Sequence, residues 1–293
     1  MLPTALAVLV AIAAGARAVY PRYLERRVRE RRALGAGGIV VGAESLDLPR
    51  NGAPVVLLIH GAGDSPQALA GLARHLHAEG FAVRVPLLSG HGRELRAFGS
   101  VRAQTWHEDV RREYATLREL HDWVGVVGLS MGGALAITLA AQHREIPALV
   151  LLSPYVAMRP ILRGAAVTSS IWGPALPYFP SGGKESIHDR AAADRARNAG
   201  VFTPAALRAL YDVVHDASGA LGAVESPTLM IQSREDNRIR VEDAARTFRS
   251  IGSAEKELVW TEGAGHVITV DFGHERVFSL TSDWLTARAR VSA

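Results

Sequence analysis

The chain has 293 residues, of which 48% are hydrophobic and 21% are charged, so it can bury a sizeable core and is not disordered over most of its length. The formal net charge is +4, but seven Arg and two Glu between Arg17 and Arg32 already give +5, which leaves −1 for the rest. Because the basic character belongs to one short segment, no nucleic-acid partner is predicted. The absence of cysteine excludes disulfides, thiolate nucleophiles and thiolate metal sites.

The N-terminal segment is apolar and is followed by the arginine cluster. Residues 2–16 carry no charge, and the apolar run continues past Arg17 to Val19. As a helix, this run would measure about 27 Å at about 1.5 Å per residue, near the thickness of a bilayer's hydrocarbon core. We therefore expect residues 1–33 to form a single-pass membrane anchor and a basic segment, with the catalytic domain on the cytoplasmic side. The alternatives are a cleaved signal peptide, which would give a secreted or periplasmic enzyme, and an apolar helix that lies on the membrane or on the domain.

After a glycine-rich stretch at residues 34–38, short apolar runs alternate with segments of helical character. The run VVLLI at residues 55–59 is uninterrupted and rich in branched side chains, which is typical of a strand buried on both faces of a parallel sheet. Similar runs lie at residues 82–85, 124–127, 148–152, 228–231 and 257–260, with predicted helices near residues 66–79, 104–120, 131–142, 241–251 and 272–287. The alternation predicts a three-layer α/β core with a mostly parallel sheet over residues 34–153 and 224–293.

One interval interrupts this alternation. Residues 154–223 contain no buried-strand pattern, whereas proline and glycine recur there. A structureless loop of that length is uncommon inside a compact domain, so we expect an inserted lid of short helices. Its aromatic side chains are compatible with an acyl site or with packing inside the lid, and the sequence assigns none of them.

Residues 128–132 read GLSMG and match the motif G-x-S-x-G. They lie between a predicted strand and a predicted helix that begins with small residues. A nucleophile on such a sharp strand-to-helix turn projects its hydroxyl from the sheet, and the turn has room only for small neighbours. Ser130 is therefore the predicted nucleophile, and the alternative is a glycine-rich turn without catalysis.

The sequence HGAGD follows the first strong strand prediction directly, at residues 60–64. A hydrolase with a serine elbow takes one oxyanion donor from this loop and the other from the residue after the nucleophile. This predicts the backbone N–H groups of Ala62 and Met131 as the oxyanion hole. For this motif alone, the alternative is a glycine-rich turn between a strand and a helix.

The acid and the base of such an enzyme follow the serine in that order. Asp236 comes just after a predicted strand, and we prefer it to the nearby acids Glu235 and Asp243. His266 lies in a glycine-flanked loop between the last predicted strand and the last predicted helix, a place from which an imidazole reaches Ser130. The predicted triad is Ser130, Asp236 and His266.

The chain has 11 histidines, and most of them lack a catalytic context. We expect His60 to shape the oxyanion loop, His91 to fix a turn and His274 to be exposed on the last helix. No pair of histidines makes H-E-x-x-H or another metal-ligand spacing. The sequence therefore predicts no metal site and no cofactor.

Together these segments resemble the monoacylglycerol lipase and carboxylesterase branch of the α/β-hydrolase superfamily, close to the group of serine aminopeptidase-like hydrolases. The matching segments lie within residues 55–271 in the family's order and read LLIHGAGDSP, PLLSGHG, TWHEDV, GLSMGG, PTLMIQSREDNRI and GAGHVITVD. The resemblance implies the α/β-hydrolase fold and hydrolysis of short or medium acyl esters or monoacylglycerols without a cofactor, under a helical lid. Asn237, the lid segment and the apolar N-terminus depart from the family pattern.

The predicted chemistry is a two-step acyl transfer through an acyl-enzyme on Ser130, with a small-molecule ester or a lipid-derived ester as substrate. The same residues would serve a thioesterase, an amidase or a perhydrolase, which differ only in the leaving group or the acceptor. Dehalogenases of this fold normally carry Asp in place of the serine, which argues against that reaction. A non-catalytic binding protein is a further alternative, although such relatives tend to lose members of the triad.

Overall fold

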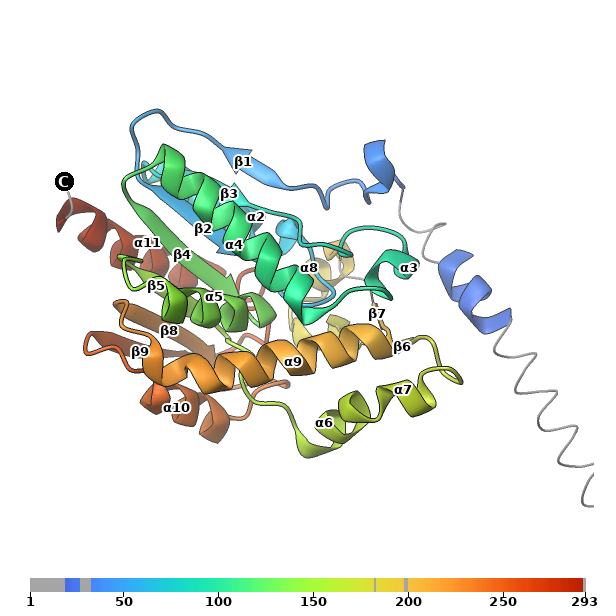
Figure 1. Cartoon of the computed structure of the whole chain (residues 1–293). Coiled ribbons are helices and arrows are strands. Elements are labelled where there is room, and N and C mark those ends of the chain that lie inside the picture. The colour runs from blue at the N-terminus through green and yellow to red at the C-terminus, as the bar shows by residue number, and fades with distance from the viewer. Residues whose placement is uncertain (1–18, 27–32, 182, 198–199, 292–293) are drawn as a thin grey trace, which may run out of the picture.

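The computed structural model describes residues 19–26, 33–181, 183–197 and 200–291 (Figure 1). Its central sheet has seven strands in the order β1-β3-β2-β4-β5-β8-β9. Only β1 runs antiparallel to its neighbour, and the other neighbouring strands are parallel. The strands are β1 (Leu46–Leu48), β2 (Val55–Ile59), β3 (Ala82–Val85), β4 (Val124–Leu129), β5 (Leu149–Leu152), β8 (Thr228–Ser233) and β9 (Lys256–Thr261). The mostly parallel sheet predicted from the sequence is confirmed.

Helices cover both faces of the sheet, because successive side chains of each strand point to opposite faces (Figure 1). In β2, Leu57 belongs to the core formed with α4, α5 and α9, whereas Leu58 belongs to the core formed with α2 and α11. These helices are α2 (Ala70–Ala78), α4 (Ala103–Leu120), α5 (Met131–Gln142), α9 (Pro204–Ala220) and α11 (His274–Val291). The uninterrupted apolar run of β2 thus reflects burial on both sides.

The interval between β5 and β8 holds most of the irregular structure. Its elements are α6 (Pro160–Val167), α7 (Ser169–Trp172), β6 (Phe179–Pro180), η3 (Gly183–Ser186), α8 (Arg190–Arg195), β7 (Val201–Phe202), α9 and η4 (Leu221–Ala223). Strands β6 and β7 form a separate antiparallel pair. Helix α9 runs along α5 and buries one face in the core, whereas α6 and α7 pack against α9 on the side away from the central sheet (Figure 1).

The remaining elements are short connections and one helix at the edge of the sheet. They are η1 (Ala36–Gly38), η2 (Pro66–Leu69), α3 (Leu95–Phe98) and α10 (Val241–Ser250). Helix α10 follows β8 and begins with two acidic side chains, Glu242 and Asp243, which suits the positive end of a helix dipole.

A helical segment at residues 19–26 contacts the interval between β5 and β8. Leu24 packs against a small cluster that includes Tyr178, and Glu25 accepts a hydrogen bond of 2.9 Å from the Tyr178 hydroxyl. This helix therefore rests on the protein through an apolar and a charged side chain.

No helix among the described residues is long and apolar enough to cross a membrane. This finding contradicts the expected single-pass anchor with a cytoplasmic catalytic domain, and the predicted membrane-associated location is corrected accordingly. The prediction rested on the hydropathy of residues 2–19, most of which lie outside the described residues.

Candidate active site

The turn between β4 and α5 holds Ser130 in a strained backbone conformation. Its φ of 56° and ψ of −117° lie in a region that residues other than glycine rarely occupy. A Cβ added to Gly128 would lie 2.3 Å from the Gly132 carbonyl oxygen, and one added to Gly132 would lie 2.0 Å from the Ile59 carbonyl oxygen. The two glycines are therefore required by close backbone approach, and together they position the serine at the carboxyl end of the sheet.

The three residues of the predicted triad form one hydrogen-bonded chain. His266 Nε2 lies 2.8 Å from Ser130 Oγ, and His266 Nδ1 lies 2.8 Å from Asp236 Oδ2. The side chain of Asp236 is fully buried and that of His266 nearly so. In the neutral imidazole, Nδ1–H donates to the carboxylate and Nε2 accepts the serine hydroxyl proton, which is the arrangement that makes a serine nucleophilic.

Asp236 lies in the turn that follows β8, and backbone amides hold its carboxylate. Oδ1 accepts N–H bonds from Arg238 (2.7 Å) and Ile239 (3.0 Å), and Oδ2 also accepts from Gln232 Nε2 (2.8 Å). Burial raises the pKa of this carboxyl, but the charge and hydrogen bond of His266 and the two backbone amides outweigh burial and leave the pKa below its usual value. Asp236 is therefore ionised at neutral pH.

Glu235 and Asp243, the two other acids considered from the sequence, bind other partners. Glu235 Oε1 accepts the Gly263 N–H at 2.7 Å, and Asp243 pairs with Arg240 at 2.7 Å at the start of α10. Neither carboxylate is hydrogen-bonded to His266 among the interactions of the described residues. The geometry thus separates Asp236 from its sequence neighbours.

The predicted oxyanion donors flank the serine. Ala62 lies in the loop after β2 and lines the same cavity as Ser130, and a Cβ added to the preceding residue, Gly61, would lie 3.2 Å from the Ser130 Cβ. Met131 is the first residue of α5, and N–H groups in the first turn of a helix have no acceptor within that helix. Both amides therefore lie near the hydroxyl that would attack a carbonyl, at the positive end of the α5 dipole.

His60 anchors the oxyanion loop at residues 60–64 through hydrogen bonds of its buried ring. It is fully buried, its Nε2 accepts the Leu88 N–H at 3.1 Å, and its Nδ1–H donates to the Gly61 carbonyl at 2.9 Å. Burial lowers the pKa of His60 to about 4, so the ring is neutral at physiological pH. The neighbouring His91 is also buried, and burial lowers its pKa well below the usual value. The third of these histidines, His274, is half-buried rather than exposed, because its Nδ1 bonds to the Asp271 carbonyl at 2.8 Å.

Ser130 and His266 open into a cavity of about 270 Å³. Its wall is mainly apolar and comes from the loop after β5, α6, the β6–β7 pair and α9, through Tyr155, Met158, Leu162, Phe179, Phe202, Leu207 and Leu210. Three of these are aromatic residues that the sequence leaves unassigned. Asp64 and Arg238 add one negative and one positive charge to the wall. The cavity therefore offers an apolar site for an acyl chain next to a polar edge.

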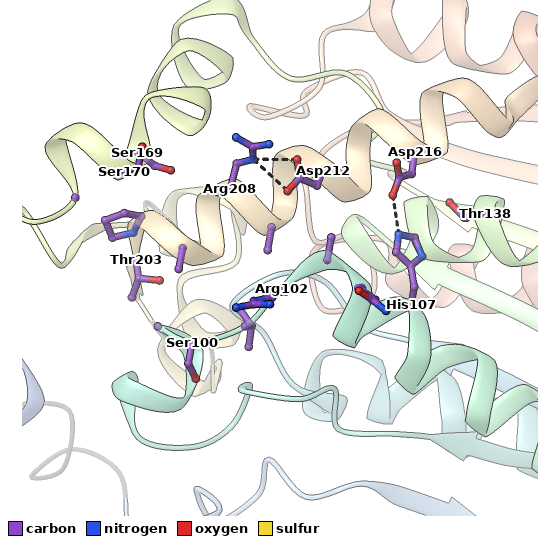
Figure 2. A pocket seen from close by; sticks show the side chains of 18 of the residues that line it. Ser100, Arg102, His107, Thr138, Ser169, Ser170, Thr203, Arg208, Asp212 and Asp216 are labelled. Carbon is purple, nitrogen blue, oxygen red and sulfur yellow. Dashed lines mark hydrogen bonds and ion pairs between the residues drawn. The ribbon is translucent and has the colours of Figure 1, made fainter.

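A larger groove of about 1520 Å³ lies between α4 and α9 (Figure 2), and no residue of the triad lines it. His107 faces Asp216 across it at 3.3 Å, and Arg208 pairs with Asp212 at 3.0 Å along α9. Size alone therefore does not locate the chemistry in this molecule. Among the described residues, no group of three or more His, Asp or Glu side chains could hold a metal ion.

The triad was predicted from motifs, but several supporting residues were not. Gln232, which is buried and bonds Asp236, is the next-to-last residue of β8 and follows the apolar run at residues 229–231. A polar residue at the carboxyl end of a buried strand is a usable signal for a site residue. Arg238 directly follows Asn237 in the acid loop, and nothing in the sequence distinguishes it from the surface arginines around it.

The sheet order, the serine on a strained elbow and the acid and histidine on later loops define a serine hydrolase of the α/β-hydrolase fold. The chain belongs to the serine aminopeptidase S33 family, whose model matches residues 51–272.

Named relatives agree with this assignment. The chain is 29% identical over 253 residues to a thermostable monoacylglycerol lipase from Bacillus sp. (strain H-257), which covers 86% of this chain and 97% of the relative. It is 26% identical over 223 residues to a carboxylesterase from Bacillus subtilis (strain 168), which covers 76% of this chain and 88% of the relative. A structure solved in work on LipS and LipT, two metagenome-derived lipolytic enzymes, superimposes with a TM-score of 0.77 at 29% identity and covers 84% of this chain and 98% of that one. The chain is a carboxylic ester hydrolase, as its motifs predict.

Proposed function

We propose that the protein cleaves carboxylic esters through an acyl-enzyme on Ser130, with His266 as general base and Asp236 as the residue that orients it. The observation that carries this proposal is the continuous chain of two 2.8 Å hydrogen bonds from the serine hydroxyl to the buried carboxylate. The Ser130 oxygen bonds to the ester carbonyl carbon as its proton passes to His266 Nε2. The backbone amides of Ala62 and Met131 then bind the oxyanion.

The tetrahedral intermediate collapses when the bond to the alcohol breaks, and the alcohol leaves with the proton from His266. Water then attacks the acyl-enzyme, giving its proton to the same nitrogen. The acid departs and Ser130 regains its proton. Asp236 remains ionised throughout and stabilises the imidazolium that forms in both steps.

We infer that short or medium acyl esters, including monoacylglycerols, are the substrates. Ligand cavities in proteins commonly measure about 300–1,000 Å³, and the cavity at Ser130, at about 270 Å³, is slightly smaller than that range. Its apolar wall suits an acyl chain, and its polar edge at Asp64 and Arg238 suits an alcohol with hydroxyl groups. A monoacylglycerol lipase and a carboxylesterase among the relatives support the same range.

We further propose that the lid lies within residues 154–223 and comprises α6, α7, the β6–β7 pair and α8. Met158, Leu162 and Phe179 from this region line the cavity, which supports a role in choosing the acyl chain. The same interval contains α9, which is packed on α5, so the movable part of the insertion ends before Pro204.

The test is hydrolysis of p-nitrophenyl esters from acetate to palmitate, together with monoacylglycerols, by the wild type and Ser130→Ala. We expect a maximum at a short or medium chain and a fall in kcat of about 10⁴-fold or more in the variant. Wild-type rates in the folded variant would contradict the role of Ser130. A fluorophosphonate probe separates the remaining alternatives: a binding protein is not labelled, and a thioesterase or an amidase is labelled but leaves the esters intact.

A further inference from the structure

A lid segment at residues 185–189, hereafter the latch, contacts the loop that carries Asp236. Asn237 Nδ2 donates to the Glu185 carbonyl at 3.0 Å, and Arg238 Nε donates to the Ser186 hydroxyl at 2.8 Å. Asn237 and Arg238 are the two residues that follow the acid. The latch therefore holds the acid loop through its next neighbours without touching the carboxylate of Asp236 itself.

The latch also contacts the loop that carries His266, again through the residues next to the catalytic one. The Val267 N–H donates to the Ser186 carbonyl at 3.1 Å, and a Cβ added to Gly265 would lie 2.6 Å from that same oxygen. Gly265 and Val267 are the residues on either side of His266. One short segment of the lid therefore packs against the chain directly before and after the base.

Asp271, which precedes α11, joins the latch to the histidine loop through four backbone amides. Oδ2 accepts from the N–H groups of Gly265 and His188, both at 2.7 Å, and Oδ1 accepts from those of Asp189 at 2.8 Å and Phe272 at 2.9 Å. The residue is 1% exposed. Hydrogen bonds to an ionised carboxylate are about twice as strong as neutral ones, so this carboxylate fixes three chain segments relative to one another.

The ionisation of Asp271 follows from the same contacts. Burial alone raises the pKa of this carboxyl, but the amides of His188, Gly265, Asp189 and Phe272 outweigh burial and leave the pKa below its usual value. All four donors are N–H groups, which can only donate, so they favour the charged form.

The hydrogen bond between Gly265 and Asp271 restricts the movement of the His266 imidazole. Gly265 immediately precedes His266, so a shift of the Gly265 backbone moves the imidazole that must span two 2.8 Å bonds. A displacement of about 1 Å in a catalytic group can cost about 10²-fold in rate. The bond from Gly265 N–H to Asp271 opposes such a displacement.

We propose that Asp271 is a positioning residue for ester hydrolysis, which holds the His266 loop against the latch so that the imidazole stands between Ser130 and Asp236. The inference rests on the proposed function of the triad. Asp271 touches neither the substrate nor the reacting atoms, and it acts through the Gly265 peptide. It also makes the lid a part of the support for the base, in addition to its place in the cavity wall.

The first test replaces Asp271 with Asn, which keeps the shape but turns one acceptor into an NH₂ group that faces N–H donors. We expect kcat on p-nitrophenyl butyrate to fall by about 10- to 100-fold, with KM changed less than about twofold, because Asp271 does not line the cavity. Active sites are titrated with a fluorophosphonate, and kcat is expressed per titrated site. A merely structural role would lower the titrated fraction and leave kcat per site unchanged, which would overturn the inference.

The matched control is Asp243→Asn. Asp243 is also a buried carboxylate, but it pairs with Arg240 on α10, outside the site. We expect this variant to keep the wild-type kcat per site. A fall as large as that of Asp271→Asn would show that loss of any buried carboxylate disturbs the enzyme, and it would remove the support for a specific role of Asp271.

A second pair of variants tests the same bonds if Asp271→Asn does not fold. Asp189 has a φ of −66°, which proline adopts, so Asp189→Pro deletes the N–H that Asp271 accepts. Asp189→Ala retains that N–H and removes only the side-chain cap of α8. We expect kcat of the proline variant to be about fivefold below that of the alanine variant, the equivalent of one hydrogen bond. Equal values would contradict the inference.

The rate at which the fluorophosphonate labels Ser130 is measured in parallel. Wild type that is labelled but cleaves no ester would contradict the proposed function, and a labelling rate that falls in Asp271→Asn would still support the positioning role. Wild type that cleaves esters, with unchanged kcat and labelling rate in the variant, would contradict the positioning role alone.

Discussion

Asp236 differs from its neighbours in sequence in its burial and in its hydrogen bonds. Its side chain is fully buried and accepts bonds from His266, Gln232 and two backbone amides, whereas the adjacent Glu235 is half-exposed and bonds to Gly263. The orientation of the imidazole therefore depends on one carboxylate among several nearby.

We expect Asp236→Asn to lower kcat by about 10⁴-fold with little change in KM, because the amide favours the wrong tautomer of His266 and does not stabilise its cation. Glu235→Gln serves as the control and should stay within about twofold of wild type. Steady-state kinetics on p-nitrophenyl butyrate measure both. A larger fall in kcat for Glu235→Gln than for Asp236→Asn would assign the role of the triad acid to Glu235.

At the level of elements, the contact between β2 and the start of α5 sets the site. Gly132 lies so close to the Ile59 carbonyl that a methyl group would have to push the strand and the helix apart. The oxyanion loop begins directly after Ile59, and the nucleophile lies two residues before Gly132. A change at this contact therefore acts on stability and on catalysis together.

Gly132→Ala should destabilise the fold by about 1–3 kcal/mol, the usual cost of overpacking, and should lower kcat at temperatures where the variant is still folded. Gly164→Ala is the control, because Gly164 lies within α6 with nothing within 4 Å of the added Cβ. It should stabilise the protein slightly, since alanine is a better helix former than glycine. Urea unfolding and esterase kinetics of both variants test this prediction, and equal stabilities would contradict it.

Elements with a strong local pattern were predictable from the sequence, and those that depend on partners were not. The uninterrupted strand β2 and the GLSMG elbow were found because burial and sharp turns restrict the residues allowed there. Strand β1 was missed because it is a three-residue edge strand, LDL, without an apolar run. Helix α9 has apolar residues at helical spacing, but the sequence does not reveal that it packs on α5.

The same limit explains which site residues were found. Ser130, Asp236 and His266 occupy motifs in a fixed order along the chain. Asp271 is the last residue of the family segment GAGHVITVD, but the sequence does not predict a role for it, because its hydrogen-bond partner His188 is 83 residues away. Contacts of that kind depend on the folded lid, and no local pattern records them.

At the scale of the whole molecule, buried neutral histidines make the fold sensitive to acid. His91 is packed against Phe98 and Trp106, and its buried Nε2 has no hydrogen-bond partner among the described residues. Burial lowers the pKa of His60 to about 4 and that of His91 well below its usual value. Below pH of about 6.5, the unfolded chain therefore takes up protons that the folded protein does not, and stability falls as the pH falls.

We expect His91→Phe to make the decline in Tm between pH 7 and pH 5 shallower than in wild type. The substitution removes one buried imidazole, and the Ser89 carbonyl that His91 contacts still accepts a bond of 3.0 Å from Trp106 Nε1. Thermal unfolding followed by circular dichroism across this range measures the slope. An unchanged slope would assign the acid sensitivity to other groups.

The latch at residues 185–189 divides the insertion into an exchangeable part and a fixed part. Helix α6 contributes Leu162 to the cavity, and neither α6 nor α7 makes any of the latch bonds to the catalytic loops described above. Chimeras that graft the α6–α7 region from a relative, with junctions before the latch, would carry over its acyl preference and keep the native supports of the base. Grafts that exchange the whole insertion would import a foreign latch onto native loops, and turnover would be lost along with the original selectivity.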